Sequence, residues 1–207
     1  MGDHLRFEPA RGADGGQGAD QPGVDGRRVV FDTYCGVKKL PPVKVDLVVG
    51  SLMTTSPEEL SSSVFDFDGV EPVRMKLYPV VDHIADKVCA TQARYGSDGS
   101  QSSRVRDLVD LVVFARTQNL DGSALTIALE QEWAARRLEG SLAFKPPSSW
   151  ATQYPSLARG VRACDGFTTF DSATALIVRL LEPVRNGKAD GQRWERSTLQ
   201  WTTVDDD

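Results

Sequence analysis

The chain has 207 residues, enough for one ordinary domain or for a small α/β lobe followed by a helical one. Its 40% hydrophobic and 26% charged residues are typical of globular proteins, so the composition excludes a largely disordered or fibrous chain. The formal net charge of -5 argues against nucleic-acid binding through high overall basicity, but it leaves room for a local basic cleft.

The spacing of the cysteines and the hydropathy of the sequence bear on the cellular compartment of the protein. Cys35, Cys89 and Cys164 lie far apart, without a Cys-x-x-Cys pair or a histidine at metal-ligand spacing, so we expect buried thiols. The sequence has no apolar run near the roughly 20 residues that a membrane helix needs. Its N-terminus lacks the charged start and apolar core of a signal peptide. We therefore expect a cytoplasmic protein with no membrane partner.

The first half of the chain predicts strands. Residues 1–26 are rich in glycine and have almost no apolar periodicity, which predicts a flexible N-terminal segment. Residues 28–34 and 43–49 each have the composition of a strand, and two neighbouring antiparallel strands would fit. Residues 73–78 favour a third strand before Pro79.

The second half predicts helices. Apolar residues at helical spacing mark one helix from Val80 to about Arg94 and a second that starts near Ser102 or Ser103, both plausible N-caps. Further helical stretches are expected at about 123–138, 150–164 and 171–181. The predicted fold class is therefore α+β, a small β-sheet lobe followed by a mostly helical C-terminal region.

Lys87 and Asp107 are candidates for chemistry on the first two helices. Lys87 lies at the margin of the apolar stripe of its helix, where a lysine either snorkels to solvent or points into a cleft. On the next helix Arg104, Asp107 and Leu111 share a ridge, which places a carboxylate beside an apolar seam. A buried ion pair between the helices would use the same residues, so a purely structural role stays open.

Asp46 is a third candidate, the lone carboxylate among the apolar residues of 45–49. A buried carboxylate costs free energy unless it is paired or binds a metal. Nucleotidyl transfer uses such groups, because divalent ions held by carboxylates neutralise a triphosphate. We expect Asp46 to be a metal ligand.

These residues, in this order, resemble the AbiEii/AbiGii toxin family. The similarity runs from the Asp46 strand through Tyr78-Pro79 and the Lys87 helix to the Asp107 helix. It continues at Trp133 to Arg136, which resembles the family's aromatic-x-x-Arg helix, and it covers roughly residues 28–201.

The resemblance implies a nucleotidyltransferase-like core at residues 27–118 and a helical region at 119–207. It implies the toxin of a toxin–antitoxin pair, because MenT-type members transfer nucleotides from NTPs to the 3′ acceptor end of tRNA and block translation. By this resemblance Lys87 would bind the triphosphate, Asp107 would be the catalytic or orienting carboxylate, and Arg136 would contact substrate. Arg104, on the Lys87 side of the cleft, is also expected to contact substrate. Asp46 would bind Mg²⁺ or Mn²⁺, and the partners would be NTP, tRNA and a cognate antitoxin.

One motif of the family is missing. Members usually open with Gly-Ser followed about ten residues later by Asp-x-Asp or Asp-x-Glu on a strand, and no such strand precedes Asp46. Gly50-Ser51 followed by Asp66-Phe67-Asp68 resembles this motif, but its spacing is too long and it leaves too little chain before Lys87.

The missing motif leaves several interpretations open. We expect a shortened or decayed toxin, a start site chosen too late, or a rebuilt metal site. The alternatives in function are a catalytically weak module that still binds nucleotide, RNA or a partner, and a scaffold in which Asp46, Lys87 and Asp107 form a buried ion network.

Overall fold

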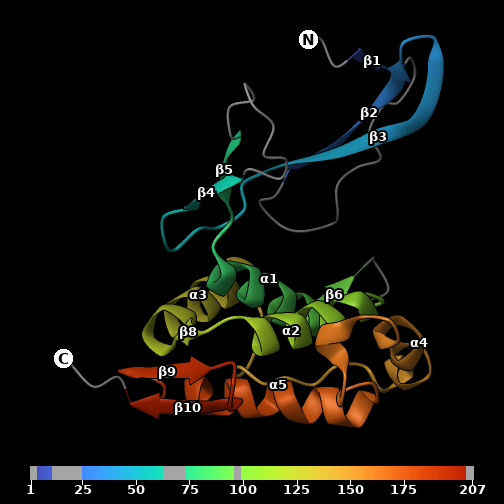
Figure 1. The fold of residues 1–207 in the computed structure, drawn as a ribbon. Coiled ribbons are helices and arrows are strands. Elements are labelled where there is room, and N and C mark those ends of the chain that lie inside the picture. The colour runs from blue at the N-terminus through green and yellow to red at the C-terminus, as the bar shows by residue number, and fades with distance from the viewer. Residues whose placement is uncertain (1–3, 11–24, 63–72, 96–98, 204–207) are drawn as a thin grey trace. The chain divides into compact units, whose positions relative to one another are not determined.

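The computed structural model describes residues 4–10, 25–62, 73–95 and 99–203. The chain divides into two compact units, residues 1–51 and 52–207. The described residues form small antiparallel sheets and five α-helices (Figure 1), so the expected α+β class is confirmed.

The first unit is a three-stranded antiparallel sheet in the order β1-β2-β3. Its strands are β1 (Leu5–Pro9), β2 (Asp25–Cys35) and β3 (Lys38–Val49). β2 and β3 pair from Asp25 with Val49 to Cys35 with Lys38, which confirms the two predicted antiparallel strands. Gly36, with φ of 58°, allows the tight turn between them.

Two expectations about this unit differ from the structure. A flexible segment was expected for residues 1–26, of which residues 1–3 and 11–24 lie outside the described residues. Leu5–Pro9 within it forms β1, because its backbone pairs with Phe31 to Cys35 of β2. A buried strand was expected around Asp46, yet the side chains of β3 are exposed at every position except the partly buried Leu40. The described residues of this unit form a single sheet without a packed second layer, which leaves β3 exposed.

The second unit contains the helices and three small sheets. The sheets are β4-β5, β6-β7 and β8-β9-β10, all antiparallel. The strands are β4 (Glu58–Ser62), β5 (Val73–Leu77), β6 (Arg94–Tyr95), β7 (Ser100–Gln101), β8 (Leu120–Asp121), β9 (Gln192–Glu195) and β10 (Gln200–Thr203). β5 confirms the third predicted strand, whereas β9 and β10 were not predicted. Asp66 and Asp68 lie outside the described residues.

The helices follow the predicted pattern. They are α1 (Val80–Gln92), α2 (Val105–Thr117), α3 (Gly122–Ala135), α4 (Tyr154–Ala158) and α5 (Phe170–Arg185). The stretch expected at 150–164 is divided into the 3-10 helix η1 (Ser148–Thr152), α4 and the 3-10 helix η2 (Arg162–Cys164).

Polar side chains cap two of these helices. The side chain of Asp121 accepts a hydrogen bond from the Ala124 N–H at the start of α3, and Thr169 accepts one from the Ser172 N–H at the start of α5. The predicted serine cap of α2 is wrong, because the N-cap is Arg104 without a side-chain cap bond. Ser102 Oγ instead accepts the Arg104 N–H before the helix begins.

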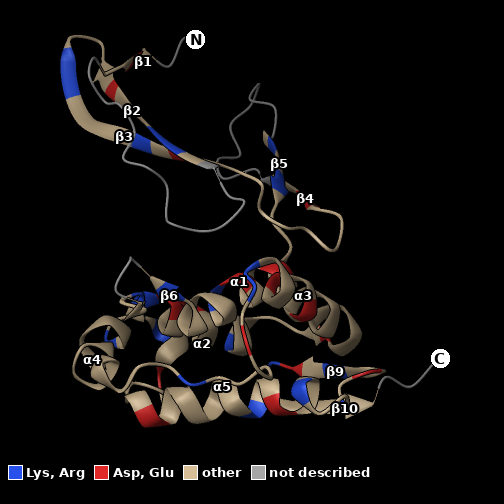
Figure 2. Cartoon of the chain, turned by 180° about the vertical axis from the view of Figure 1, so that it is seen from behind, with Lys and Arg blue, Asp and Glu red and all other residues tan. Residues whose placement is uncertain are grey.

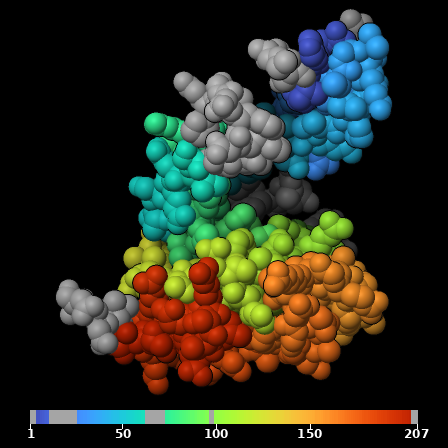
Figure 3. Space-filling model, viewed as in Figure 1, coloured from blue at the N-terminus to red at the C-terminus, as the bar shows by residue number. Residues whose placement is uncertain are grey.

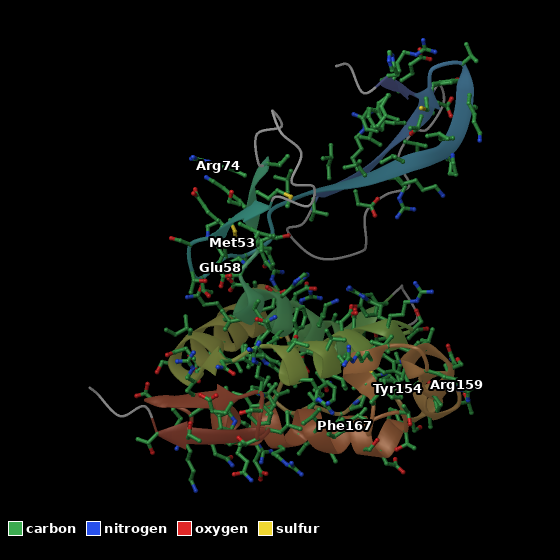
Figure 4. All side chains as sticks on the ribbon, viewed as in Figure 1. Met53, Glu58, Arg74, Tyr154, Arg159 and Phe167 are labelled. Carbon is green, nitrogen blue, oxygen red and sulfur yellow. The ribbon has the colours of Figure 1, made fainter. Side chains whose placement is uncertain are left out.

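One hydrophobic core holds the second unit together, and α1, α2, α3 and α5 all contribute to it. On the face seen in Figure 3, the green and yellow residues of the first helices lie directly against the orange and red residues near the C-terminus. Buried polar atoms of the large aromatic side chains are satisfied: Trp150 Nε1 donates to Ser102 O, and Trp194 Nε1 to Ala115 O. The hydroxyl of Tyr154 donates to the Phe167 carbonyl, and both residues are labelled in Figure 4.

The expected burial of the cysteines is partly confirmed. Cys89 and Cys164 are buried free thiols, whereas Cys35 is exposed at the end of β2. Burial raises the pKa of Cys89 to about 12, which makes it an inert packing residue. In the part of the chain that is described, none of the helices has the length and apolar character of a membrane span.

A substitution at Gly122 tests how closely the start of α3 packs against the residues that follow α5. A Cβ atom built on Gly122 would lie 1.9 Å from the Ala189 carbonyl oxygen, a backbone atom that cannot rotate away. We expect Gly122→Ala to lower the free energy of unfolding by about 2 kcal/mol or more in urea denaturation. Ile127→Ala, at an exposed position of the same helix, should change it much less. Equal stability of the two variants would contradict this packing.

Candidate functional site

Lys87 is buried between α1 and α2. Its side chain is only 11% exposed, and its Nζ lies 2.6 Å from Asp110 Oδ2 and 3.3 Å from Asp107 Oδ1. Both carboxylates come from α2, so the ammonium bridges the two helices. The structure therefore brings together Lys87 and Asp107, which the sequence placed on successive helices.

Asp107 is held between two cations. Arg104 Nε lies 2.9 Å from Asp107 Oδ2, and Lys87 occupies the other oxygen. The Arg104 contact lacks hydrogen-bond geometry, so Oδ2 is a buried acceptor without a hydrogen-bond partner. Burial raises the pKa of Asp107 above its ordinary value, although the charges of Arg104 and Lys87 oppose this shift. Asp107 is thus a carboxylate with a raised pKa, and its Oδ2 lies in an ion pair with Arg104 but accepts no hydrogen bond.

Asp110 is a member of the site that the sequence analysis did not select. It makes the shorter of the two contacts to Lys87, yet its side chain is 47% exposed against 6% for Asp107. Its position one helical turn after Asp107 was visible in the sequence, but only the structure shows its contact with Lys87. Two cations and two carboxylates give this cluster a formal charge near zero, and Figure 2 shows residues of both signs on α1 and α2.

Arg136 belongs to a second cluster. It follows α3 directly, its side chain is 4% exposed, and it contacts Glu132 one turn earlier and Asp86 on α1. Burial alone would lower the pKa of Arg136, but the hydrogen bond to Glu132 and the charge of Asp86 raise it. A guanidinium enclosed in this way has almost no surface for contact with a substrate. The Glu132 contact has the i,i+4 spacing that a sequence can show, whereas the Asp86 contact does not.

Asp46 belongs to the first unit, where it pairs with Arg28 across β2 and β3. Arg28 Nε lies 2.6 Å from Oδ1 and Nη2 lies 2.9 Å from Oδ2. The hydrogen bond from Arg28 lowers the pKa of Asp46. Both partners are more than half exposed, so this is a surface pair and the argument from burial for a metal does not hold.

The described side chains do not by themselves form a metal site. Groups of three or more His, Cys, Asp or Glu residues placed to hold an ion are absent from the described part of the chain. Asp107 Oδ2 accepts no hydrogen bond, but Arg104 lies 2.9 Å from it and Lys87 adds positive charge at the other oxygen, so both cations oppose a metal ion there. A metal ion at this carboxylate would therefore need further ligands from outside the described side chains, such as the phosphates of a bound nucleotide.

The chain before β4 is anchored to the start of α1. The backbone N–H and the hydroxyl of Thr54 both donate to the carboxylate of Asp82, which is buried in the first turn of α1. Tyr78 donates its hydroxyl to the Leu52 carbonyl, and burial with the nearby Asp82 raises the pKa of Tyr78 to about 12. These bonds fix the first turns of α1, and with them the residues that follow toward Lys87.

Lys87 and Asp107, which carried the family resemblance in the sequence, are thus in contact in the structure. The family model described as "Nucleotidyl transferase AbiEii toxin, Type IV TA system" matches residues 2–194. The chain therefore belongs to the AbiEii family of nucleotidyltransferase toxins, as the sequence analysis expected. A comparison with curated proteins gives no match.

Arg136 offers a test of the second cluster. Arg136→Met would leave the buried Glu132 and the partly buried Asp86 without this cation, so we expect a loss of about 3 kcal/mol in the free energy of unfolding. Arg137→Met is the matched control, because Arg137 is exposed and should cost about 0.5 kcal/mol or less. Chemical denaturation measures both, and a similar small effect for the two would exclude the structural role.

Proposed function

We propose that this chain is a toxin that transfers a nucleotide from an NTP to the 3′ acceptor end of a tRNA in the cytoplasm and so blocks translation. Membership of the AbiEii family supports nucleotidyl transfer. The observation that carries the assignment of the site is the buried Lys87 ammonium, shared by Asp107 and Asp110 where α1 meets α2. The tRNA substrate rests on the resemblance to MenT-type members.

Lys87 is the proposed triphosphate ligand. Its Nζ is a compact charge that binds phosphate oxygens well, but two carboxylates compete for it. Asp110 is the partner that can leave, because its side chain is far more exposed than that of Asp107. A phosphate oxygen would then take the place of Asp110 while Asp107 keeps the ammonium in position. Arg104, which is 39% exposed, is the proposed second contact to substrate.

Asp107 is the proposed catalytic or orienting carboxylate. In the transfer the RNA hydroxyl oxygen bonds to the α-phosphorus, the bond to the β-phosphate oxygen breaks, and pyrophosphate leaves. The hydroxyl proton must be accepted, and Asp107 combines a raised pKa with an oxygen, Oδ2, that accepts no hydrogen bond. Arg104 would have to move away from this oxygen. Arg136 acts as a positioning residue through Asp86, the neighbour of Lys87 on α1.

A transfer assay tests the proposal. Purified protein is incubated with each labelled NTP, Mg²⁺ and total tRNA, and we expect label on RNA with at least one NTP. Lys87→Ala should abolish the signal, because the triphosphate loses its cation. Lys188→Ala, which removes an exposed lysine after α5, should leave it unchanged.

The outcomes of this assay are distinct. No label on any RNA, with an active family member as positive control, would contradict the proposed activity. Transfer that survives Lys87→Ala would remove Lys87 from the triphosphate site. Melting curves of both lysine variants separate lost activity from lost folding.

Mg²⁺ or Mn²⁺ is the proposed metal, since nucleotidyltransferases generally use a divalent ion with the NTP, and Asp46 is the proposed ligand. Both oxygens of Asp46 are taken by Arg28, so metal binding there requires this surface pair to open.

A Mg²⁺ titration of the transfer rate tests this role. Asp46→Asn should raise the Mg²⁺ concentration for half-maximal rate by about tenfold. Asp32→Asn is a matched control, because Asp32 is also a paired carboxylate of this sheet, 3.0 Å from Lys39. An unchanged requirement in Asp46→Asn would exclude Asp46 as a ligand.

A second candidate function is a module that binds nucleotide or RNA, or a partner such as a cognate antitoxin, without efficient transfer. The observation that favours it is the neutralisation of Asp107 and Asp110 by Lys87 and Arg104, which leaves these carboxylates less suited to hold cations. NTP binding without any labelled RNA would support this function, and transfer at a rate typical of the family would contradict it.

A further inference from the structure

Three aromatic side chains lie in a row at the seam between α1 and α2. The rings of Tyr78 and His83 are 5.3 Å apart at an interplanar angle of 81°, and those of His83 and Phe114 are 5.4 Å apart at 41°. His83 is exposed, while Tyr78 and Phe114 are partly buried. We call Tyr78, His83 and Phe114 the aromatic row.

The aromatic row lies one helical turn from the Lys87 site. His83 precedes Lys87 by four residues on α1, and Phe114 follows Asp110 by four residues on α2, a rise of about 6 Å along each helix. Lys87 contacts Asp110 and His83 contacts Phe114, so the two pairs are successive contacts between antiparallel helices. A group bound at the aromatic row is therefore next to a group bound at Lys87.

The chemistry of the row suits a nucleobase. Aromatic rings that keep a face in solvent stack on bases, and such stacking tolerates every base. Partial burial and the charge of Lys87 lower the pKa of His83, which favours the neutral ring. His83 stays exposed in spite of its contacts with two rings, whereas Phe114 is partly buried and packs against the core.

We infer that His83, supported by Phe114 and Tyr78, stacks on the base of the nucleotide whose phosphates contact Lys87. A ribose separates a base from its own 5′ phosphates, so one nucleotide can reach both positions. This inference rests on the proposed triphosphate site. The structure assigns no base preference to the row, because stacking alone does not read the edge of a base.

Comparing the affinities for two ligands, one with a base and one without, isolates the contribution of the base to binding. Calorimetry measures the binding of ATP and of inorganic tripolyphosphate, each with Mg²⁺, to the full chain. The wild type should bind ATP more tightly than tripolyphosphate. The variant His83→Ala/Phe114→Leu should bind ATP about tenfold more weakly and tripolyphosphate unchanged. His83→Phe should retain the affinity for ATP, because it keeps an aromatic ring.

Two control variants separate loss of stacking from loss of folding. Ile127→Ala, at an exposed apolar position of α3, should change the affinity for neither probe. If the double variant melts at a lower temperature than the wild type, the single variant His83→Ala is used instead, because it leaves Phe114 in the core. Equal binding of the two probes by the wild type, or ATP binding unchanged in His83→Ala, overturns the stacking role alone. If neither probe binds and Lys87→Ala changes nothing, the proposed triphosphate site fails and the stacking role with it.

Discussion

The burial of the Lys87 ammonium between α1 and α2 is the constraint on which the site depends. Removing a charge from water costs several kcal/mol, and the cost is offset only when well-placed partners remain. Asp107 and Asp110 provide them, and both come from the same face of α2. The two helices must therefore keep one register, since a shift of one turn would separate the lysine from its carboxylates.

Charge pairs hold α1 on two sides. Asp86 contacts Arg136 at the end of α3, and the adjacent Lys87 contacts α2, so consecutive residues fix the helix to two neighbours. Asp82 adds a third tie, to Thr54 before β4. A helix held in this way presents Lys87 and the exposed His83 at defined positions, which is the preorganisation that binding and transfer of a nucleotide require.

Local patterns predicted most of the helices, and they left an ion pair between Lys87 and Asp107 open as one alternative. The apolar spacing after Val80 gave α1 correctly, because the helix buries one continuous face. The environment of Asp46 was not predictable, since an apolar strand has the same sequence whether or not another layer covers it. The contact of Arg136 with Asp86 could not be predicted from the sequence either, because 50 residues separate the two. Short strands such as β9 and β10 depend on tertiary pairing more than on composition.

The central claim is that the Lys87 cluster exists for chemistry and not for stability. The most direct measurement compares the free energy of unfolding and the rate of nucleotide transfer in the variant Lys87→Met/Asp107→Leu/Asp110→Leu. A buried charge cluster replaced by apolar residues of similar size often keeps or gains stability. We predict that this variant is at least as stable as the wild type and transfers no nucleotide. A variant that loses several kcal/mol of stability, or that still transfers nucleotide, would contradict the claim.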